Sequence, residues 1–210
     1  MNAADILQHK KVWNRLHSEK YEGYTENPVD VINHIPSGFL REDWVVLEIG
    51  CGAGHVMERL AGKVKELHGI DISSEALLLA EKRLQRFDNV YFHEGLGDNL
   101  SMFLDNFFDF IYSIAVFQHI PKVFTMGYLR DCVRVLKPQR KLLFQVITRL
   151  NPVENIEDIG FIKSEETRGY SKDELVKMVI ESGLKLMDIT CQKLTRRGDQ
   201  LAWFWVWSQK

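Results

Sequence analysis

Short apolar segments alternate with amphipathic segments along most of the chain. Apolar runs bounded by glycine, proline or asparagine are typical of buried strands, and five of them occur at residues 45–49, 66–70, 89–92, 108–114 and 141–147. Between these runs, apolar positions recur every three or four residues, which predicts helices. We expect these helices over residues 54–62, from Ser73 or Ser74 to Phe87, and from Pro121 to just before Lys137-Pro138.

The two ends of the chain depart from this alternation. Residues 3–22 read as a helix, and the pair Ser171 and Glu174 forms a capping box for a helix that stops at Gly183. Two strands follow, at 184–190 and 201–207, without a helix between them. Consecutive strands joined by a polar loop, here KLTRRGDQ, predict an antiparallel hairpin at one edge of the sheet.

The order of these elements predicts the fold class. Strands alternating with helices indicate an α/β protein whose mostly parallel sheet carries helices on both faces. With the C-terminal hairpin the sheet has seven strands. A length of 210 residues suits a single domain over 1–210, in which 1–38 form an N-terminal helical cap and 42–208 the core, with 148–170 as a lid or insert.

Composition excludes several classes of protein. Hydrophobic residues make up 45% of the chain and charged residues 27%, and the net charge is -2, which argues against binding to nucleic acid by bulk electrostatics. The longest apolar run, 201–207, is far shorter than the roughly 20 residues of a membrane-spanning helix. Three scattered cysteines without paired metal-ligand spacing indicate reduced thiols and no metal site. We therefore expect a soluble, cytoplasmic protein without a signal peptide.

A glycine-rich turn joins the first strand to the next helix, in the segment Glu48-Ile-Gly-Cys-Gly-Ala-Gly54. Glycines tolerate positive φ and let a ligand approach the backbone, and a helix N-terminus attracts anionic groups. Asp71 closes the second strand 21 residues after Gly50, where a carboxylate can accept the hydroxyls of a ribose. The alternative for Asp71 is a helix N-terminal carboxylate beside Ser73.

The spacing of the glycines separates two nucleotide-binding readings. A dehydrogenase fingerprint, G-x-G-x-x-G, would need its third glycine at position 55 or 57. Because these positions are His55 and Met57, the sequence does not match that fingerprint. The pattern E-x-G-x-G-x-G instead resembles the first motif of class I S-adenosylmethionine-dependent methyltransferases of the small-molecule type. HGIDIS, FFDFIYSIAVFQHIP, RVLKPQRKLLFQV and GYSKDELVKMVIESGL resemble later segments of that family, in order. The one departure is Gln139-Arg140, where the family usually has two glycines, which leaves the conformation of that turn open.

The resemblance implies a Rossmann-like fold with a helical lid, the cofactor S-adenosyl-L-methionine, and a set of residues that contact it. Glu48 should fix the glycine loop or meet the ammonium of the cofactor, Asp71 should hold the ribose, and Ile72 should pack on the adenine. Gly97-Asp98 is expected near the adenine amino group, or else forms a plain turn. The complete expected set is Tyr21, Glu48, Gly50, Cys51, Gly52, Gly54, Asp71, Ile72, Gly97, Asp98, Ser113 and Ile114.

His119 is the candidate catalytic residue. It follows the fourth strand, near where the methyl group would be presented, and as a general base it could take a proton from an attacking hydroxyl or amine. The alternative is that it packs within the loop before Pro121. On the N-terminal helix, Tyr21 and Tyr24 could cover the cofactor, whereas Trp13 and His17 read more simply as a packing stripe.

These observations predict a methyltransferase that acts on a small-molecule acceptor through an oxygen or nitrogen nucleophile. A catalytically silent S-adenosylmethionine-binding subunit, or a regulator of a partner protein, is the alternative. A macromolecular methyltransferase lacks support, because the chain has no basic run and no NPPY-type segment after the fourth strand. We expect a monomer or homodimer with no nucleic-acid or membrane partner.

Overall fold

In the computed structural model, the described residues are 3–18, 33–149, 168–196 and 199–210. Within these ranges the strands form one seven-stranded sheet in the order β3-β2-β1-β4-β5-β7-β6. The α/β class, the mostly parallel sheet and the C-terminal antiparallel hairpin are therefore confirmed. The strands are β1 (Val45–Ile49), β2 (Glu66–Asp71), β3 (Val90–Glu94), β4 (Phe108–Ser113), β5 (Leu136–Arg149), β6 (Lys185–Arg196) and β7 (Asp199–Gln209).

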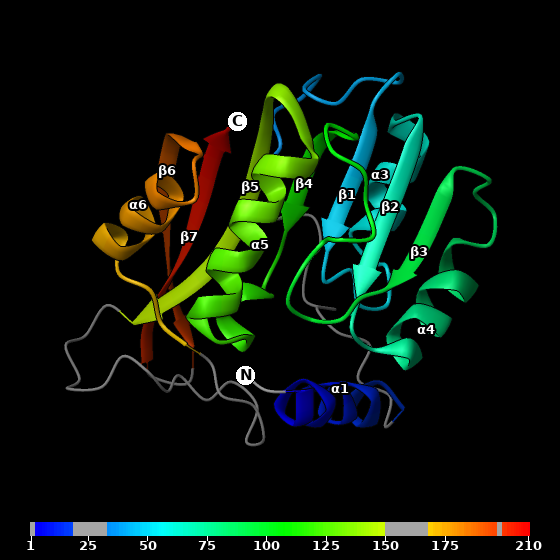
Figure 1. Cartoon of the computed structure of the whole chain (residues 1–210), viewed down its shortest axis with the longest axis horizontal. Helices are drawn as coiled ribbons and strands as arrows, with labels where there is room; N and C mark the ends of the chain where they lie inside the picture. The colour runs from blue at the N-terminus through cyan, green and yellow to red at the C-terminus, as the bar shows by residue number, and fades with distance from the viewer. Residues whose placement is uncertain (1–2, 19–32, 150–167, 197–198) are drawn as a thin grey trace. The chain divides into compact units, whose positions relative to one another are not determined.

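Helices precede the first strand and lie between several of the later ones (Figure 1). They are α1 (Ala3–Ser18), α3 (Met57–Leu60), α4 (Ser74–Leu84), α5 (Lys122–Val135) and α6 (Lys172–Glu181), with short 3-10 helices η1 (Ala61–Lys63) and η2 (Phe117–His119). The chain divides into two compact units, which we describe separately. The first unit is Met1–Asn99 with Phe108–Phe110, and the second unit is Leu100–Phe107 with Ile111–Lys210. A single domain over 1–210 stays a prediction.

The first unit contains the parallel strands β1, β2 and β3. β2 pairs with both neighbours, and every residue of β1 is buried, including Glu48 among four apolar residues. The Ser73 hydroxyl caps α4 by accepting a hydrogen bond from the Ala76 N–H at 3.1 Å. The buried face of α4 consists of Ala76, Leu77, Ala80 and Leu84.

The second unit contains the antiparallel strands and the helices that follow β4. β7 lies between β5 and β6 and pairs antiparallel with both. Pro121 precedes the first residue of α5, where its missing N–H costs no helical hydrogen bond. The Ser171 hydroxyl caps α6 by accepting from the Glu174 N–H at 3.2 Å, and Gly183, with φ +94°, follows the helix end.

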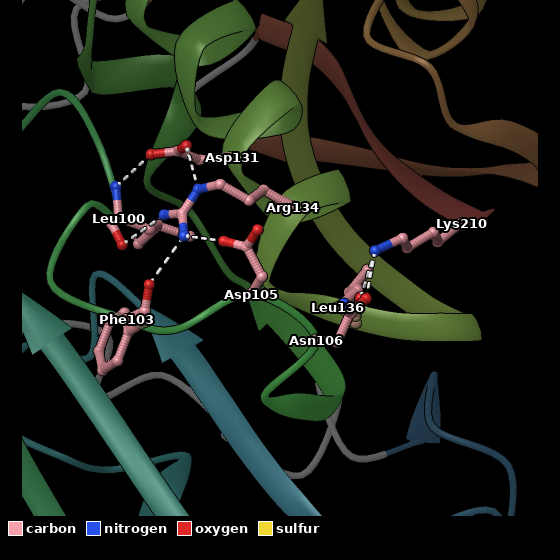
Figure 2. Close-up of polar contacts among 8 residues, drawn as sticks. All are labelled: Leu100, Phe103, Asp105, Asn106, Asp131, Arg134, Leu136 and Lys210. Atoms are coloured by element: carbon pink, nitrogen blue, oxygen red, sulfur yellow. Dashed lines mark hydrogen bonds and ion pairs between the residues drawn. The ribbon is translucent and has the colours of Figure 1, made fainter.

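Arg134, near the end of α5, holds the loop that precedes β4 (Figure 2). Its guanidinium donates to the carbonyl oxygens of Leu100 at 2.9 Å and Phe103 at 2.8 Å. It also pairs with Asp105 at 2.9 Å and with Asp131 at 3.2 Å. Asp131 in turn accepts from the Leu100 N–H at 2.6 Å. One arginine of the RVLKP segment therefore donates hydrogen bonds to backbone carbonyl oxygens of an irregular loop.

Three predicted boundaries were wrong. The helix expected over 54–62 begins only at Met57, because Gly54 has φ +77° and extends the turn. β5 begins at Leu136 instead of residue 141. Most of the polar segment 193–200 belongs to β6 and β7, with Arg196 opposite Asp199. Strand pairing uses the backbone, so polar side chains at the end of a hairpin do not prevent it.

Several expectations fall wholly or partly outside the described residues. Tyr21 and Tyr24 lie there, as does most of the insert expected over 148–170, although Thr148 and Arg149 belong to β5. No helix in the described part of the chain has both the length and the apolar character that a membrane crossing requires. Localisation in the cytoplasm stays a prediction.

Candidate functional site

The glycine-rich turn leaves β1 and folds back against the end of β2. The N–H groups of Gly50 and Cys51 both donate to the Ile70 carbonyl oxygen, at 2.7 and 3.2 Å. Gly50, Gly52 and Gly54 have φ values of +72°, +50° and +77°, a left-handed conformation that other residues adopt only at an energetic cost. The E-x-G-x-G-x-G pattern thus corresponds to three successive left-handed positions at the carboxyl end of β1.

Asp71, the last residue of β2, is fixed by two backbone donors. The Gly52 N–H donates to its Oδ2 at 2.8 Å, and the Ser73 N–H donates to its Oδ1 at 2.8 Å. Burial raises the pKa of the Asp71 carboxyl, while these N–H groups and the nearby His17 ring oppose that rise. The carboxylate therefore joins the glycine turn to the N-terminus of α4 and has one orientation.

The residues present fit the adenosyl part of S-adenosylmethionine. Each Asp71 oxygen accepts one N–H, and because a carboxylate has about four acceptor positions, both oxygens can also accept a ribose hydroxyl. Among the described residues, the only atom within 4 Å of a Cβ built on Gly52 is His17 Nε2, at 4.0 Å. At Gly54, by contrast, a Cβ would lie 2.5 Å from Leu84 Cδ1. Gly54 thus packs against α4, whereas no atom of the described residues comes closer than 4.0 Å to a Cβ on Gly52.

The segment after β3 approaches Ile72. A Cβ on Gly97 would lie 2.6 Å from Ile72 Cδ1 and 3.9 Å from Ile6 Cγ2. Asp98, the next residue, accepts a hydrogen bond from the Asn99 side chain at 2.5 Å. The structure therefore brings Ile72 and Gly97 together, and it places Ile6 of α1 beside them.

Helix α1 lies across the carboxyl ends of the strands of the first unit (Figure 1). Lys10 forms an ion pair with Glu94 at the end of β3. The Asn14 side chain donates to the Ser74 hydroxyl at 3.4 Å, and the His17 ring lies 3.5 Å from the Ser73 hydroxyl. The N-terminal helix is thus attached to the same end of the sheet as the glycine turn.

Cys51 and Glu48 are buried near the turn. Burial is the main cause that raises the pKa of the Cys51 thiol well above its ordinary value, and the charges of Asp71 and Glu48 add to it. The thiol is therefore protonated at neutral pH and is not a nucleophile. Glu48 is 3% exposed within β1. In the described ranges, no group of three or more His, Cys, Asp or Glu side chains is arranged to hold a metal ion.

In the second unit, Ser113 and Ile114 lie where β4 ends. Both are buried, and Ser113 is fully inaccessible to solvent. Ala115 follows with φ +58°, a left-handed conformation that costs a non-glycine residue on the order of 1–2 kcal/mol. Such local strain is often found at functional sites. The chain therefore turns sharply after the end of β4, where two residues of the expected cofactor-contacting set lie.

His119 lies in η2, which residues 168–170 hold in place. Three successive carbonyl oxygens of η2 accept hydrogen bonds: Phe117 from the Tyr170 hydroxyl at 2.9 Å, Gln118 from the Arg168 N–H at 2.7 Å, and His119 from the Arg168 guanidinium at 3.4 Å. Burial raises the pKa of Tyr170 to about 12, so its hydroxyl remains a donor at neutral pH. Residues 168–170 thereby fix the backbone that carries His119.

His119 itself is 9% exposed, and its Nε2 lies 3.5 Å from the Gln118 side-chain nitrogen. Sequence reasoning missed Arg168 and Tyr170, because neither has a recognisable spacing to η2. It also interpreted His17 as packing, since helical periodicity cannot tell which strand ends a helix will cover. Near Tyr170, the sequence pattern indicated only the helix cap at Ser171.

Comparison with known proteins agrees with this geometry. A family model described as a methyltransferase domain matches residues 46–139, from β1 to the first residues of β5. Over 202 residues, the chain is 25% identical to a ubiquinone biosynthesis O-methyltransferase of Nitrosospira multiformis, covering 88% of this chain and 83% of the relative. The chain is a class I S-adenosylmethionine-dependent methyltransferase. S-adenosylmethionine is accordingly its methyl donor.

Solved structures show the same fold as this methyltransferase. An S-adenosylmethionine-dependent methyltransferase from Methanosarcina mazei has a TM-score of 0.70 at 24% identity, covering 86% of this chain and 96% of that one. A phosphoethanolamine N-methyltransferase of Haemonchus contortus, in complex with S-adenosylmethionine, has a TM-score of 0.71 at 16% identity, covering 89% and 52%. Alignments with some other curated methyltransferases span only 52–66% of those proteins.

Proposed function

We propose that the methyltransferase acts on a small-molecule acceptor through an oxygen or nitrogen nucleophile. The observation that supports this acceptor class is the alignment, over 88% of the chain, with an O-methyltransferase named for ubiquinone biosynthesis. Macromolecular acceptors have less support, because the net charge is -2 and the sequence has no basic run. The acceptor itself and the state of assembly, monomer or homodimer, stay predictions.

The cofactor would be held by the first unit. Asp71 would accept the ribose hydroxyls, the glycine turn would border the methionine part, and Ile72 with Gly97-Asp98 would border the adenine. When bound, S-adenosylmethionine supplies a methyl group on a positively charged sulfur and a neutral thioether leaving group. The remaining requirement is that the acceptor is aligned with the methyl carbon and sulfur. Good alignment can lower the activation barrier by roughly 7–11 kcal/mol.

The acceptor forms its new bond to the methyl carbon with a lone pair, and a hydroxyl or ammonium acceptor must also lose a proton. His119 would take that proton. Its place in η2, after β4, is fixed by Arg168 and Tyr170, so its ring is held by a backbone that has little freedom. Histidine is the side chain most often used for such proton transfer.

The test is the effect of His119→Ala on turnover and on cofactor affinity. S-adenosylhomocysteine formation is measured with a panel of hydroquinones, catechols, phenols and primary amines. The substitution should slow turnover at least tenfold, while the Kd for S-adenosylhomocysteine changes by less than about tenfold, or ~1.4 kcal/mol. Unchanged turnover with an accepted substrate would assign His119 to packing. A panel in which no small molecule is methylated would contradict the proposed acceptor class.

A further inference from the structure

Arg83 lies in the last turn of α4 and contacts residues 53–58, which include the end of the glycine turn. Its Nε–H donates to the Ala53 carbonyl oxygen at 2.9 Å, and a second nitrogen of its guanidinium donates to the His55 ring at 3.2 Å. The third nitrogen lies 3.6 Å from a carboxylate oxygen of Glu58 in α3. One side chain of α4 therefore binds the glycine turn, a residue just after it and the first turn of the next helix.

The Ala53 carbonyl lies between two residues with left-handed backbones. Gly52 has φ +50° and Gly54 has φ +77°. Because glycine has more alternative conformations than any other residue, a turn that contains three glycines loses much conformational entropy when it becomes ordered. Ala53 is buried, so loss of the donor would leave its carbonyl oxygen in a place that water reaches poorly. The hydrogen bond from Arg83 thus favours one orientation of the 53–54 peptide.

Helix α4 also supports the turn through packing. A Cβ built on Gly54 would lie 2.5 Å from Leu84 Cδ1 and 3.2 Å from Ala80 Cβ, so the turn lies directly against this face of the helix. One of the two N–H groups that hold the Asp71 carboxylate comes from outside the turn, so Asp71 keeps a donor that Arg83 does not influence. The contacts of Arg83 therefore act chiefly on the part of the proposed site that borders the methionine end of the cofactor.

We propose that Arg83 is a positioning residue for S-adenosylmethionine: by holding the Ala53 carbonyl, it keeps the glycine turn in its binding conformation before the cofactor arrives. When only a fraction of the molecules has the binding conformation, the apparent affinity falls in proportion to that fraction. The inference rests on the proposed cofactor site at the glycine turn and Asp71, and it adds α4 to that site. It does not depend on the acceptor class.

Two substitutions of similar length isolate the hydrogen bond to Ala53. In Arg83→Gln the amide nitrogen lies as many bonds from Cα as the arginine Nε, so it can still donate to that carbonyl, although the charge is lost. In Arg83→Met a methyl group takes this position. We expect Arg83→Met to raise the Kd for S-adenosylhomocysteine about 3- to 10-fold, and Arg83→Gln to raise it less than about twofold. Isothermal titration calorimetry measures both values, and an equal loss in both variants would overturn the proposal.

Methylthioadenosine, which has the ribose and adenine but lacks the amino acid, shows whether the effect passes through the turn. Arg83→Met should raise the Kd for methylthioadenosine less than about twofold, because the adenosyl part is proposed to bind outside the turn. An equal loss for methylthioadenosine and S-adenosylhomocysteine would indicate a general structural effect and would overturn the proposal. Unchanged affinity for S-adenosylhomocysteine would overturn it as well.

Arg86→Met is the matched control on the same helix. Arg86 pairs with the same Glu58 carboxylate, at 2.8 Å, and its side chain is 61% exposed. The variant therefore removes an ion pair with α3 but leaves the donor to Ala53 in place, and it should bind S-adenosylhomocysteine like the wild type. A loss equal to that of Arg83→Met would assign the effect to Glu58 and overturn the proposal.

Asp71→Asn tells failure of this inference from failure of the proposed site. If Asp71→Asn weakens binding and Arg83→Met does not, the site stands and only the role of Arg83 is wrong. If both variants bind like the wild type, both are wrong. Thermal unfolding of each variant establishes that it is folded under the conditions of the titration.

Discussion

Gln139 is a residue whose backbone conformation conflicts with its side chain. Among the described residues, three non-glycine residues have positive φ: Asn106 at 53°, Ala115 at 58° and Gln139 at 63°. Asparagine tolerates this conformation better than most residues, but glutamine and alanine have no such tendency. Gln139 is exposed and lies near the start of β5, at the position where the family resemblance led us to expect glycine. Residue 139 therefore adopts the left-handed conformation although it is not glycine.

Gln139→Gly should consequently stabilise the protein. Removal of the Cβ relieves on the order of 1–2 kcal/mol of strain, part of which the greater freedom of glycine in the unfolded chain offsets. We expect a net gain of about 0.5–1 kcal/mol in the free energy of unfolding, measured by urea denaturation. The Gln139 carbonyl, which accepts from the Gln209 side chain at 2.8 Å, is retained. Gln139→Ala keeps the Cβ and is the control; an equal gain there would rule out backbone strain as the cause.

At the scale of elements, Arg134 attaches the 100–107 loop to α5. Arg134→Met removes the donors to the Leu100 and Phe103 carbonyl oxygens and both carboxylate contacts, while keeping most of the side-chain volume. After allowance for the partial exposure of the group, we expect a loss of about 2–3 kcal/mol in unfolding free energy. Arg130→Met, on the exposed face of the same helix, should change it by less than about 0.5 kcal/mol. A similar small change for Arg134→Met would show that the loop does not depend on this side chain.

Elements with strong local signals could be predicted from the sequence, and elements fixed by distant contacts could not. Ser73, Pro121 and Ser171 each start a helix within a residue of the prediction, because a cap acts on its own first turn. α3 is shorter than predicted, since its start depends on how the glycine turn folds against Ile70. The contacts of α1 with Ser73, Ser74 and Glu94 were likewise not predictable, because hydrophobic periodicity gives the buried face but not its partner.

At the scale of the whole molecule, a pair of histidines makes stability depend on pH. His68 Nδ1 lies 2.9 Å from His93 Nε2 and the rings stack, so only one of these two nitrogens can carry a proton. Burial lowers the pKa of His68, opposed by Glu66, and burial together with the neighbouring His68 lowers the pKa of His93 to about 4. Protonation of both rings would replace the hydrogen bond with a repulsion.

The free energy of unfolding should therefore fall as the pH is lowered through this window. In the unfolded chain His93 binds a proton near pH 6.5, whereas in the folded protein it does so near pH 4. The stability that comes from keeping His93 neutral is therefore fully present above about pH 6.5 and is lost as the pH falls toward 4. Because His93 is only half-buried, we expect a loss of about 1–2 kcal/mol between pH 6.5 and 4.5. His93→Phe should reduce this dependence and His34→Phe should not. An unchanged slope in His93→Phe would contradict the assignment.

The central claim is that the turn at Gly52 and the carboxylate of Asp71 hold S-adenosylmethionine. Calorimetric titration of the wild type and Asp71→Ala with S-adenosylhomocysteine and with NAD tests it most directly. The wild type should bind S-adenosylhomocysteine and not NAD, and Asp71→Ala should lose about 2–4 kcal/mol of binding free energy, since it removes two ribose hydrogen bonds to a charged acceptor. Tighter binding of NAD than of S-adenosylhomocysteine, or an affinity unchanged in Asp71→Ala, would contradict the account.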